Sequence, residues 1–136
     1  MKTSLNFNNI NKILRQSNVD VAYLFGSHAT GTQTRESDVD IAVLLPEKTT
    51  PKKRFETRLH LMELLEKQLG KAIDLIIIND IKSLFFKYVI VKEGKVIYLK
   101  SEERRIDFEC RTLSLYFDFQ PFLELYNKNY VKNNLK

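Results

Sequence analysis

A glycine–serine pair and two aspartates one residue apart are the residues of this chain best suited to chemistry. Gly26 and Ser27 end an apolar run, and Asp38 and Asp40 follow after ten intervening residues, at the start of a second apolar run. Because side chains alternate between the two faces of a strand, Asp38 and Asp40 are expected to point the same way. Two adjacent carboxylates repel each other, and a divalent cation removes that penalty. Since Mg²⁺ is typically held by one or two carboxylates together with substrate phosphates, the pair predicts a metal site that binds a triphosphate.

A third carboxylate, Asp74, interrupts the apolar segment 72–78. We expect this segment to be a strand buried on both faces, where an unpaired charge is costly, so Asp74 needs a partner. If this strand lies beside the strand that begins at Asp38, the three carboxylates converge on one metal site. In a two-metal arrangement one ion aligns the attacking oxygen and the other the leaving phosphate. Asp74 is also a candidate to accept the proton of an acceptor hydroxyl.

Gly26, Ser27 and Arg35 are the candidates for binding the nucleotide. A glycine at a strand end lets the backbone approach phosphate closely. The Ser27 hydroxyl and the amides that follow it can donate to phosphate oxygens, especially if a helix begins there. Arg35 lies in the loop just before the acids, within reach of the phosphates, whereas His28 and His60 are expected to be ordinary loop and helix residues. Each feature alone has a structural explanation, so the prediction depends on their combination.

The apolar pattern predicts the elements that position these residues. In chain order we expect a helix over residues 6–17, strands over 19–25 and 39–45, a helix over 50–69, a strand over 72–78, a helix over 81–91, a strand over 96–99 and a helix over about 102–131. Thr50 and Pro51 are suited to begin the long middle helix, and Gly70 is suited to end it. The order predicts an α/β (α+β) fold, a small mixed sheet flanked by helices, with residues 1–136 forming a single domain.

Two helices carry apolar residues whose placement matters. The helix over 50–69 is expected to bury one stripe, formed by Phe55, Leu59, Met62, Leu65 and Leu69. Pro121 predicts a kink in the last helix. That helix carries aromatic residues that are not confined to one stripe: Phe108, Tyr116, Phe117, Phe119, Phe122, Tyr126 and Tyr130. One face should pack on the sheet, and the other belongs either to the core or to a partner interface.

The bulk composition is that of an ordinary globular protein, with 136 residues, 43% hydrophobic and 29% charged. No apolar stretch approaches the roughly 20 residues that span a bilayer, and no signal-peptide core is present, so we expect a cytoplasmic location without a membrane partner. Cys110 is the only cysteine, which excludes a disulfide framework, and it is expected to be buried. The basic clusters 52–54 and 104–105 are expected to be solvated, and nucleic acid is not expected as a stable partner.

The residues Gly26-Ser27, Asp38-Val39-Asp40 and Asp74 resemble the nucleotidyltransferase superfamily of the DNA polymerase β type, with a match over about residues 19–126. The short chain looks like a minimal nucleotidyltransferase, and the segment 111–126 resembles the last helix of the MntA antitoxins that are paired with HEPN ribonuclease toxins. The resemblance implies a polymerase β-like fold and transfer of a nucleoside monophosphate to a hydroxyl, with Mg²⁺ and loss of pyrophosphate. For the antitoxin branch it implies AMP transfer from ATP to a tyrosine of the toxin, in a hetero-oligomer. Many relatives carry arginine directly after the glycine–serine pair, where this chain has His28, and Arg35 is the candidate to replace that contact.

Only one helix is expected after the last strand, which is too little for a domain that binds the acceptor. We therefore expect the acceptor to be held by another subunit or to be a partner protein. Two alternatives stay open. The first is a non-catalytic antitoxin that neutralises its toxin by occlusion, and the second is a nucleotidyltransferase for a small molecule or an RNA end.

Overall fold

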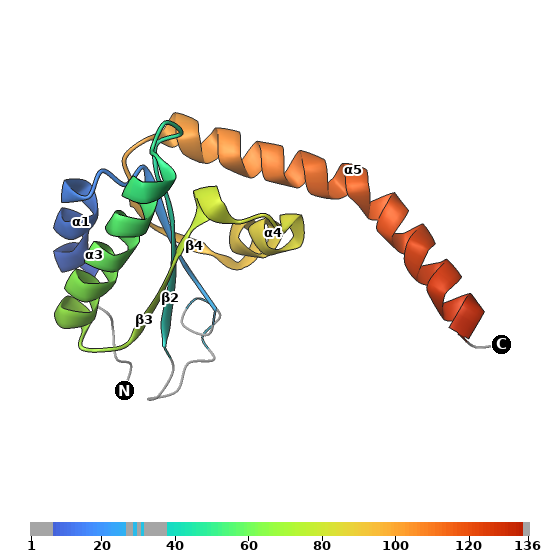
Figure 1. The fold of residues 1–136 in the computed structure, drawn as a ribbon, viewed down its shortest axis with the longest axis horizontal. Coiled ribbons are helices and arrows are strands. Elements are labelled where there is room, and N and C mark those ends of the chain that lie inside the picture. Colours follow the sequence, from blue (N-terminus) through green and yellow to red (C-terminus); the bar gives the residue numbers. More distant parts are fainter. Residues whose placement is uncertain (1–6, 27–28, 30, 32–37, 135–136) are drawn as a thin grey trace.

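The computed structural model describes residues 7–26, 29, 31 and 38–134, with side chains between residues 9 and 118 (Figure 1). The helices and strands are α1 (Phe7–Gln16), β1 (Val21–Phe25), β2 (Val39–Leu44), α3 (Pro51–Leu69), β3 (Ile73–Ile77), the 3₁₀ turn η1 (Ile78–Asp80), α4 (Leu84–Glu93), β4 (Lys95–Leu99) and α5 (Glu102–Asn134). The predicted order of helices and strands is therefore confirmed. Helix α4 begins at Leu84, later than expected, because Ser83 accepts a hydrogen bond from Phe86 N and caps the helix there. Helix α5 continues beyond its expected end, to Asn134.

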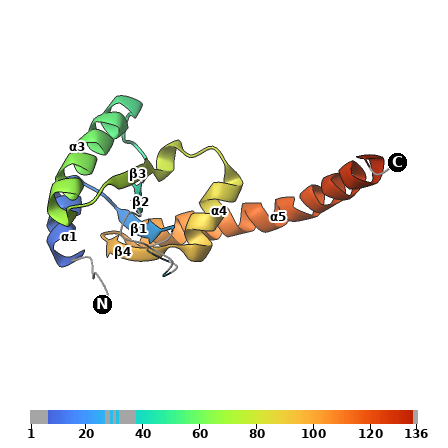
Figure 2. The same cartoon turned by 90° about the horizontal axis from the view of Figure 1, so that it is seen from below.

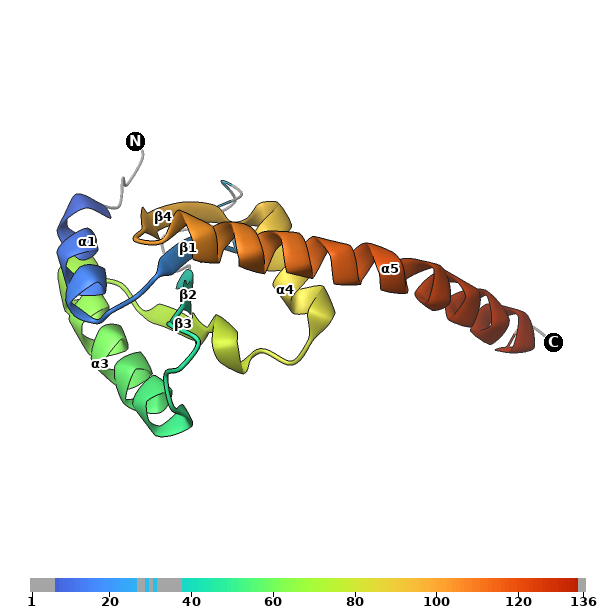
Figure 3. The same ribbon diagram turned by 90° about the horizontal axis from the view of Figure 1, so that it is seen from above.

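The described strands form one mixed sheet in the order β3-β2-β1-β4. β2 and β3 are parallel, whereas β1 is antiparallel to both β2 and β4. Helices α1 and α3 cover one face of the sheet, and α4 and α5 lie on the other (Figures 2 and 3). This arrangement confirms the predicted fold class, a small mixed sheet flanked by helices.

Alternate residues of β2 point into two separate hydrophobic cores. Val39 and Ile41 belong to the core beneath α1 and α3. Ala42 and Leu44 belong to the core beneath α4 and α5. Because Asp40 has the same parity as Ala42 and Leu44, its side chain lies on the α4 face of the sheet.

The caps of α3 are those expected from the sequence. Thr50 Oγ1 accepts a hydrogen bond from Lys53 N at 3.2 Å, and Pro51 occupies the first turn. Gly70 ends the helix in the left-handed conformation with φ of 67°, and its amide donates to Glu66 O. These local signals fix both ends of the helix without reference to the rest of the chain.

The buried face of α3 differs from the predicted stripe. Phe55 and Leu59 are 60% and 49% exposed, so their assignment to the core is wrong. The buried residues are Thr57, Leu61 and Leu65, so the predicted burial of Leu65 is confirmed. Met62 and Leu69 of the predicted stripe are partly buried against the same core. Apolar residues lie on both rows, and packing against α1 and the sheet selects the row through Leu61. The helical period of the sequence alone does not show which of these two rows is buried.

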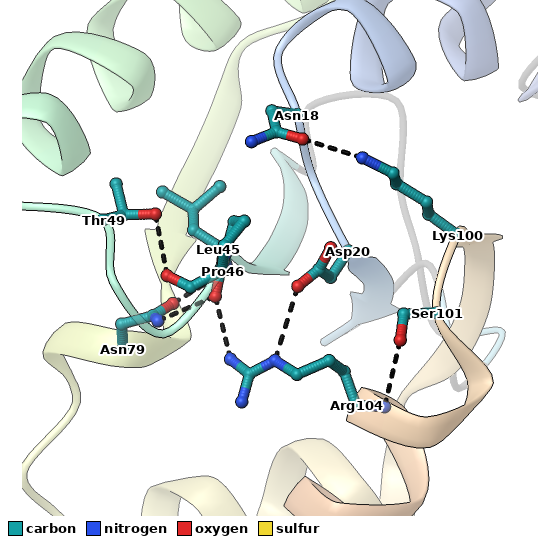
Figure 4. Close-up of polar contacts among 9 residues, drawn as sticks. All are labelled: Asn18, Asp20, Leu45, Pro46, Thr49, Asn79, Lys100, Ser101 and Arg104. Atoms are coloured by element: carbon teal, nitrogen blue, oxygen red, sulfur yellow. Dashed lines mark hydrogen bonds and ion pairs between the residues drawn. The ribbon is translucent and has the colours of Figure 1, made fainter.

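Arg104 fixes the start of α5 to the end of the sheet away from Asp40 (Figure 4). Its Nε lies 3.4 Å from Asp20 Oδ2, and its Nη2 donates to Leu45 O at 2.9 Å. Asp20 O accepts from the amides of Lys100 and Ser101. The expected solvated role of Arg104 is therefore wrong, because Arg104 and Asp20 together hold the ends of β2, β4 and α5.

A buried tyrosine joins α5 to β1. The Tyr23 hydroxyl donates to Glu109 Oε2 at 2.7 Å, and the ring packs against Phe108 with centroids 6.0 Å apart. Burial, together with the hydrogen bond and the charge of Glu109, raises the pKa of Tyr23 well above its ordinary value. Arg105 in turn pairs with Glu109 and Glu102, which both lie on its own helix.

The rest of α5 extends away from the sheet. The helix continues through Pro121 to Asn134, and its ribbon changes direction between its orange and red parts, as the proline predicts (Figure 1). Cys110 is exposed, so its expected burial is wrong; it lies on the side of α5 that faces away from Phe108. Within the described residues, no helix is both long and apolar enough to cross a membrane.

Candidate active site

Two of the predicted carboxylates lie side by side. In the parallel register of β2 and β3, Asp40 is the direct partner of Asp74. Neighbouring strands are roughly 4.8 Å apart, and partners in register point to the same face. The two strands are therefore neighbours, which is the condition that convergence of the carboxylates requires, and both carboxylates lie on the α4 face of the sheet.

The environment of Asp74 differs from the prediction. β3 is an edge strand, and Asp74 is exposed while Ile73 and Leu75 on either side are buried. The expectation of burial on both faces is wrong because it assumed a central strand. Asp74 needs no partner to offset burial, so its position beside Asp40 is the remaining structural reason to assign it to the site.

Gly26 brings the end of β1 against the Asp40 carboxylate. Phe25 pairs with Asp40 in the sheet, and Gly26 follows with φ of 72°, a left-handed conformation that favours glycine. A Cβ added at Gly26 would come closer than 3.0 Å to Asp40 Oδ2, a separation that real Cβ atoms essentially never show. The residue at position 26 must therefore be glycine for Asp40 to keep its place.

The remaining predicted residues are placed less completely. Asp38 is exposed and immediately precedes β2, two residues from Asp40. Ser27, His28 and Arg35 lie outside the described residues. Within residues 7–26, 29, 31 and 38–134, no three His, Cys, Asp or Glu side chains are close enough to hold a metal ion among themselves. The three-carboxylate metal site thus stays a prediction, with Asp40 and Asp74 as its adjacent pair.

Comparison with known proteins identifies the family of this chain. A family model described as "Polymerase beta, Nucleotidyltransferase" matches residues 8–103. The chain belongs to this family. It is 32% identical over 118 residues to the protein adenylyltransferase MntA of Shewanella oneidensis, a match that covers 85% of this chain and 81% of MntA. The aspartates and Gly26 thus lie within a nucleotidyltransferase domain.

Solved structures give the same family. A toxin–antitoxin structure with AMP-PNP matches with a TM-score of 0.73 and 30% identity, over 93% of this chain and 99% of that chain. A structure of the tri-AMPylated Shewanella oneidensis HEPN toxin in complex with its MNT antitoxin matches with a TM-score of 0.65 and 26% identity, over 93% and 97%. The nucleotidyltransferase fold therefore extends over nearly the whole chain.

A contact between two aromatic rings, which the sequence did not reveal, lies beside the predicted site. The Phe86 ring of α4 meets the Phe25 ring edge-on, with centroids 5.9 Å apart. Since Phe25 is the register partner of Asp40, α4 stands beside the carboxylates. These two phenylalanines are 61 residues apart in sequence, and only the tertiary fold brings them together.

Two side chains of α3 hold the strand that carries Asp74. Ala72 O accepts from Val39 N, so even-numbered residues of β3 direct their backbone groups toward β2 and odd-numbered residues direct theirs outward. On that outer edge, Ile73 N donates to Glu66 Oε2 at 3.1 Å, and Arg58 Nε donates to Leu75 O at 2.9 Å. The backbone around Asp74 is therefore held from both sides.

A cavity of about 300 Å³ lies far from the carboxylates, at the end of the sheet marked by Leu44. Its lining includes Arg54, Arg104 and Arg111, each of which is paired with an aspartate. Because these charges are already neutralised and the cavity lies at the other end of β2, it is a poor candidate for the triphosphate site.

The donor set of the site fits a magnesium ion. Nucleotidyltransferases of this family generally use a divalent metal with the nucleotide. Asp40 and Asp74 supply oxygen atoms, which Mg²⁺ prefers, and Gly26 leaves the space beside Asp40 Oδ2 free of a side-chain carbon. Asp38, exposed at the start of β2, can contribute a further oxygen. The other ligands would come from the nucleotide.

Proposed function

We propose that this protein is the antitoxin of a HEPN/MNT toxin–antitoxin pair and acts as a Mg²⁺-dependent protein adenylyltransferase. In this function AMP moves from ATP to a tyrosine hydroxyl of the HEPN ribonuclease toxin. The observation that carries the proposal is the register pairing of Asp40 with Asp74 beside Gly26, within a chain that belongs to the nucleotidyltransferase family. The similarity to MntA, a protein adenylyltransferase, supports the choice of donor and acceptor.

The chemistry assigned to the residues is as follows. The tyrosine oxygen attacks the α-phosphorus of ATP, the bond from that phosphorus to the bridging oxygen breaks, and pyrophosphate leaves. Asp38, Asp40 and Asp74 would hold a bound metal ion, and Asp74 accepts the hydroxyl proton. Bound Mg²⁺ would offset the negative charge on the carboxylates and the triphosphate. Gly26, Ser27 and Arg35 bind the phosphates in this proposal.

The acceptor is assigned to a partner protein because the chain is similar to MntA, a protein adenylyltransferase. The last strand ends at Leu99, and one helix, α5, occupies residues 102–134. The similar structures of a toxin–antitoxin and of an AMPylated HEPN toxin with its antitoxin support a hetero-oligomer of this kind. We place the complex in the cytoplasm, where ATP is available.

Labelled ATP tests the proposal. The protein is incubated with Mg²⁺, ATP labelled in the α-phosphate and the HEPN-domain protein encoded beside it. Label should appear on the HEPN protein, on tyrosine, and the toxin should lose its ribonuclease activity. Asp40→Asn should abolish the label without unfolding the protein. Label that appears instead in a small-molecule or RNA fraction would identify a different acceptor and reject the proposal.

Neutralisation by occlusion is the second candidate, and the exposed side chains of α4 and α5 favour it. Phe85, Leu115 and Phe117 offer an apolar surface that could cover a partner without any chemistry. A double variant, Asp38→Asn with Asp40→Asn, separates the two functions. If occlusion is sufficient, this variant still neutralises the toxin when ATP is present; if transfer is required, neutralisation is lost although the complex forms.

A further inference from the structure

Five side chains on α4 and α5 form an apolar surface outside both hydrophobic cores. They are Phe85 and Tyr88 of α4 and Leu115, Tyr116 and Phe117 of α5, which we call the aromatic patch. Phe85, Leu115 and Phe117 are 61%, 52% and 54% exposed. Several large apolar side chains that gather on two adjoining helices indicate contact with another molecule.

The aromatic patch is organised by its own ring contacts. Tyr88 and Tyr116 stack with centroids 3.8 Å apart and planes 7° from parallel. Phe117 meets the Tyr88 ring edge-on at 6.2 Å, and Phe85 lies 6.5 Å from Tyr116. Rings that already hold one another lose little conformational freedom when a partner binds. Aromatic residues are also enriched in the cores of protein interfaces.

A lysine of α4, Lys92, lies against the aromatic patch. Lys92 Nζ lies 5.8 Å from the centroid of the Tyr88 ring, and Lys87 lies beside Tyr88 in sequence. Neither Lys82, Lys87 nor Lys92 forms an ion pair with another side chain in the described part of the chain. Complementary charge guides association, so the matching surface of a partner should be acidic around an apolar centre.

The aromatic patch is connected to the transfer site through α4. Phe85 is next to Phe86, whose ring packs on Phe25, the register partner of Asp40. Beyond the patch, α5 continues away from α4 and the sheet (Figures 1 and 3). A protein bound on the patch is therefore held on the face of the sheet that carries Asp40 and Asp74.

We propose that the aromatic patch is the docking surface for the acceptor protein, and that this acceptor presents an apolar face flanked by acidic side chains. The inference rests on the proposed transfer of AMP to a protein. Single-stranded RNA is a poorer fit, because bases stack on free aromatic faces and Tyr88 and Tyr116 stack on each other. Lys92, beside the Tyr88 ring, fits the acidic flank of a protein.

The test compares two double variants of the full chain. Phe85→Ser with Phe117→Ser removes exposed rings from the patch. Phe55→Ser with Leu59→Ser is the matched control, because it removes side chains of similar exposure from α3, on the opposite face of the sheet. Binding of the HEPN-domain protein is measured by titration calorimetry without ATP, and transfer is measured separately. Circular dichroism and Tm report the folding of each variant.

We expect the patch variant to bind the HEPN protein about thirtyfold more weakly and to show a raised KM for it, with kcat close to wild type at saturation. The control variant should bind and transfer as the wild type does. Wild-type affinity in a folded patch variant would overturn the inference. Weakened binding in a system where even the wild type transfers no AMP would support the docking surface while rejecting the proposed reaction.

Hydrogen exchange on the wild-type complex gives a second measurement that does not depend on any variant. Protection over residues 84–93 and 111–118 when the HEPN protein is added supports the inference, and protection confined to α1 and α3 contradicts it. A single-stranded oligouridylate is tested in parallel. RNA binding that the patch variant loses, with HEPN binding intact, would assign the surface to RNA and overturn the proposal.

Discussion

Gly26→Ala tests whether the left-handed turn after β1 exists to keep Asp40 in place. The alanine Cβ would come closer than 3.0 Å to Asp40 Oδ2, whereas ordinary van der Waals contact begins near 3.4 Å. The carboxylate must therefore move by about 1 Å, and a displacement of that size can cost about a hundredfold in rate. A left-handed non-glycine residue costs in addition about 1–2 kcal/mol of stability. We expect label transfer to fall about a hundredfold while the protein stays folded.

Gly70→Ala is the matched control for this prediction. Gly70 has φ of 67°, close to the 72° of Gly26, but nothing lies within 4 Å of its added Cβ. Both variants should therefore lose a similar amount of stability, measured by urea unfolding, and only Gly26→Ala should lose transfer activity. Equal activities in the two variants would refute the steric argument. So would an active Gly26→Ala variant whose stability has fallen as expected.

Further predictions concern residues that stabilise the fold around the site, and the divalent metal. Tyr23→Phe should remove a pH dependence of the free energy of unfolding. Folding raises the pKa of Tyr23, so the stability that the protonated phenol contributes in the wild type is present below pH 10.0 and declines above it. Urea unfolding of both proteins over this pH range measures the difference. Arg104→Met should destabilise by about 2 kcal/mol in thermal unfolding, because it leaves the Asp20 carboxylate without its ion-pair partner. Arg58→Met should lose about 1 kcal/mol and reduce transfer, because Leu75 O loses its donor beside Asp74. Removal of divalent metal with EDTA should stop transfer, and added Mg²⁺ should restore it.

The features predicted correctly from the sequence depend on short-range signals. Thr50, Pro51 and Gly70 mark the ends of α3 through the conformations that each favours, and the tertiary fold leaves those preferences unchanged. The adjacency of the strands bearing Asp40 and Asp74 was only a condition of the predicted site, because the sequence does not specify strand order, and the structure meets that condition.

The features missed by the sequence depend on which elements become neighbours. The buried row of α3 is chosen by its packing against α1, so Phe55 was assigned to the core although it is exposed. Asp74 was assigned to a buried strand because strand order, which makes β3 an edge, has no local signal. The pairing of Asp20 with Arg104 and the contact of Phe25 with Phe86 join residues far apart in sequence, where no periodicity reports them.

The two ends of the sheet carry different groups of residues, and this division separates the residues proposed for transfer from those that hold the last helix. At one end, β1, β2 and β3 bring Gly26, Asp40 and Asp74 together, and Glu66 and Arg58 of α3 hold the outer strand. At the other end, the start of α5 is tied to the sheet through salt-bridged and backbone contacts (Figure 4). Helix α4 connects the predicted site with the aromatic patch. Its Phe86 packs on Phe25, the register partner of Asp40, and its Tyr88 belongs to the patch. A partner docked on α4 and α5 would thus be positioned by a rigid frame that contributes none of the three aspartates, so variants of the patch should alter acceptor binding and variants of the strands should alter chemistry.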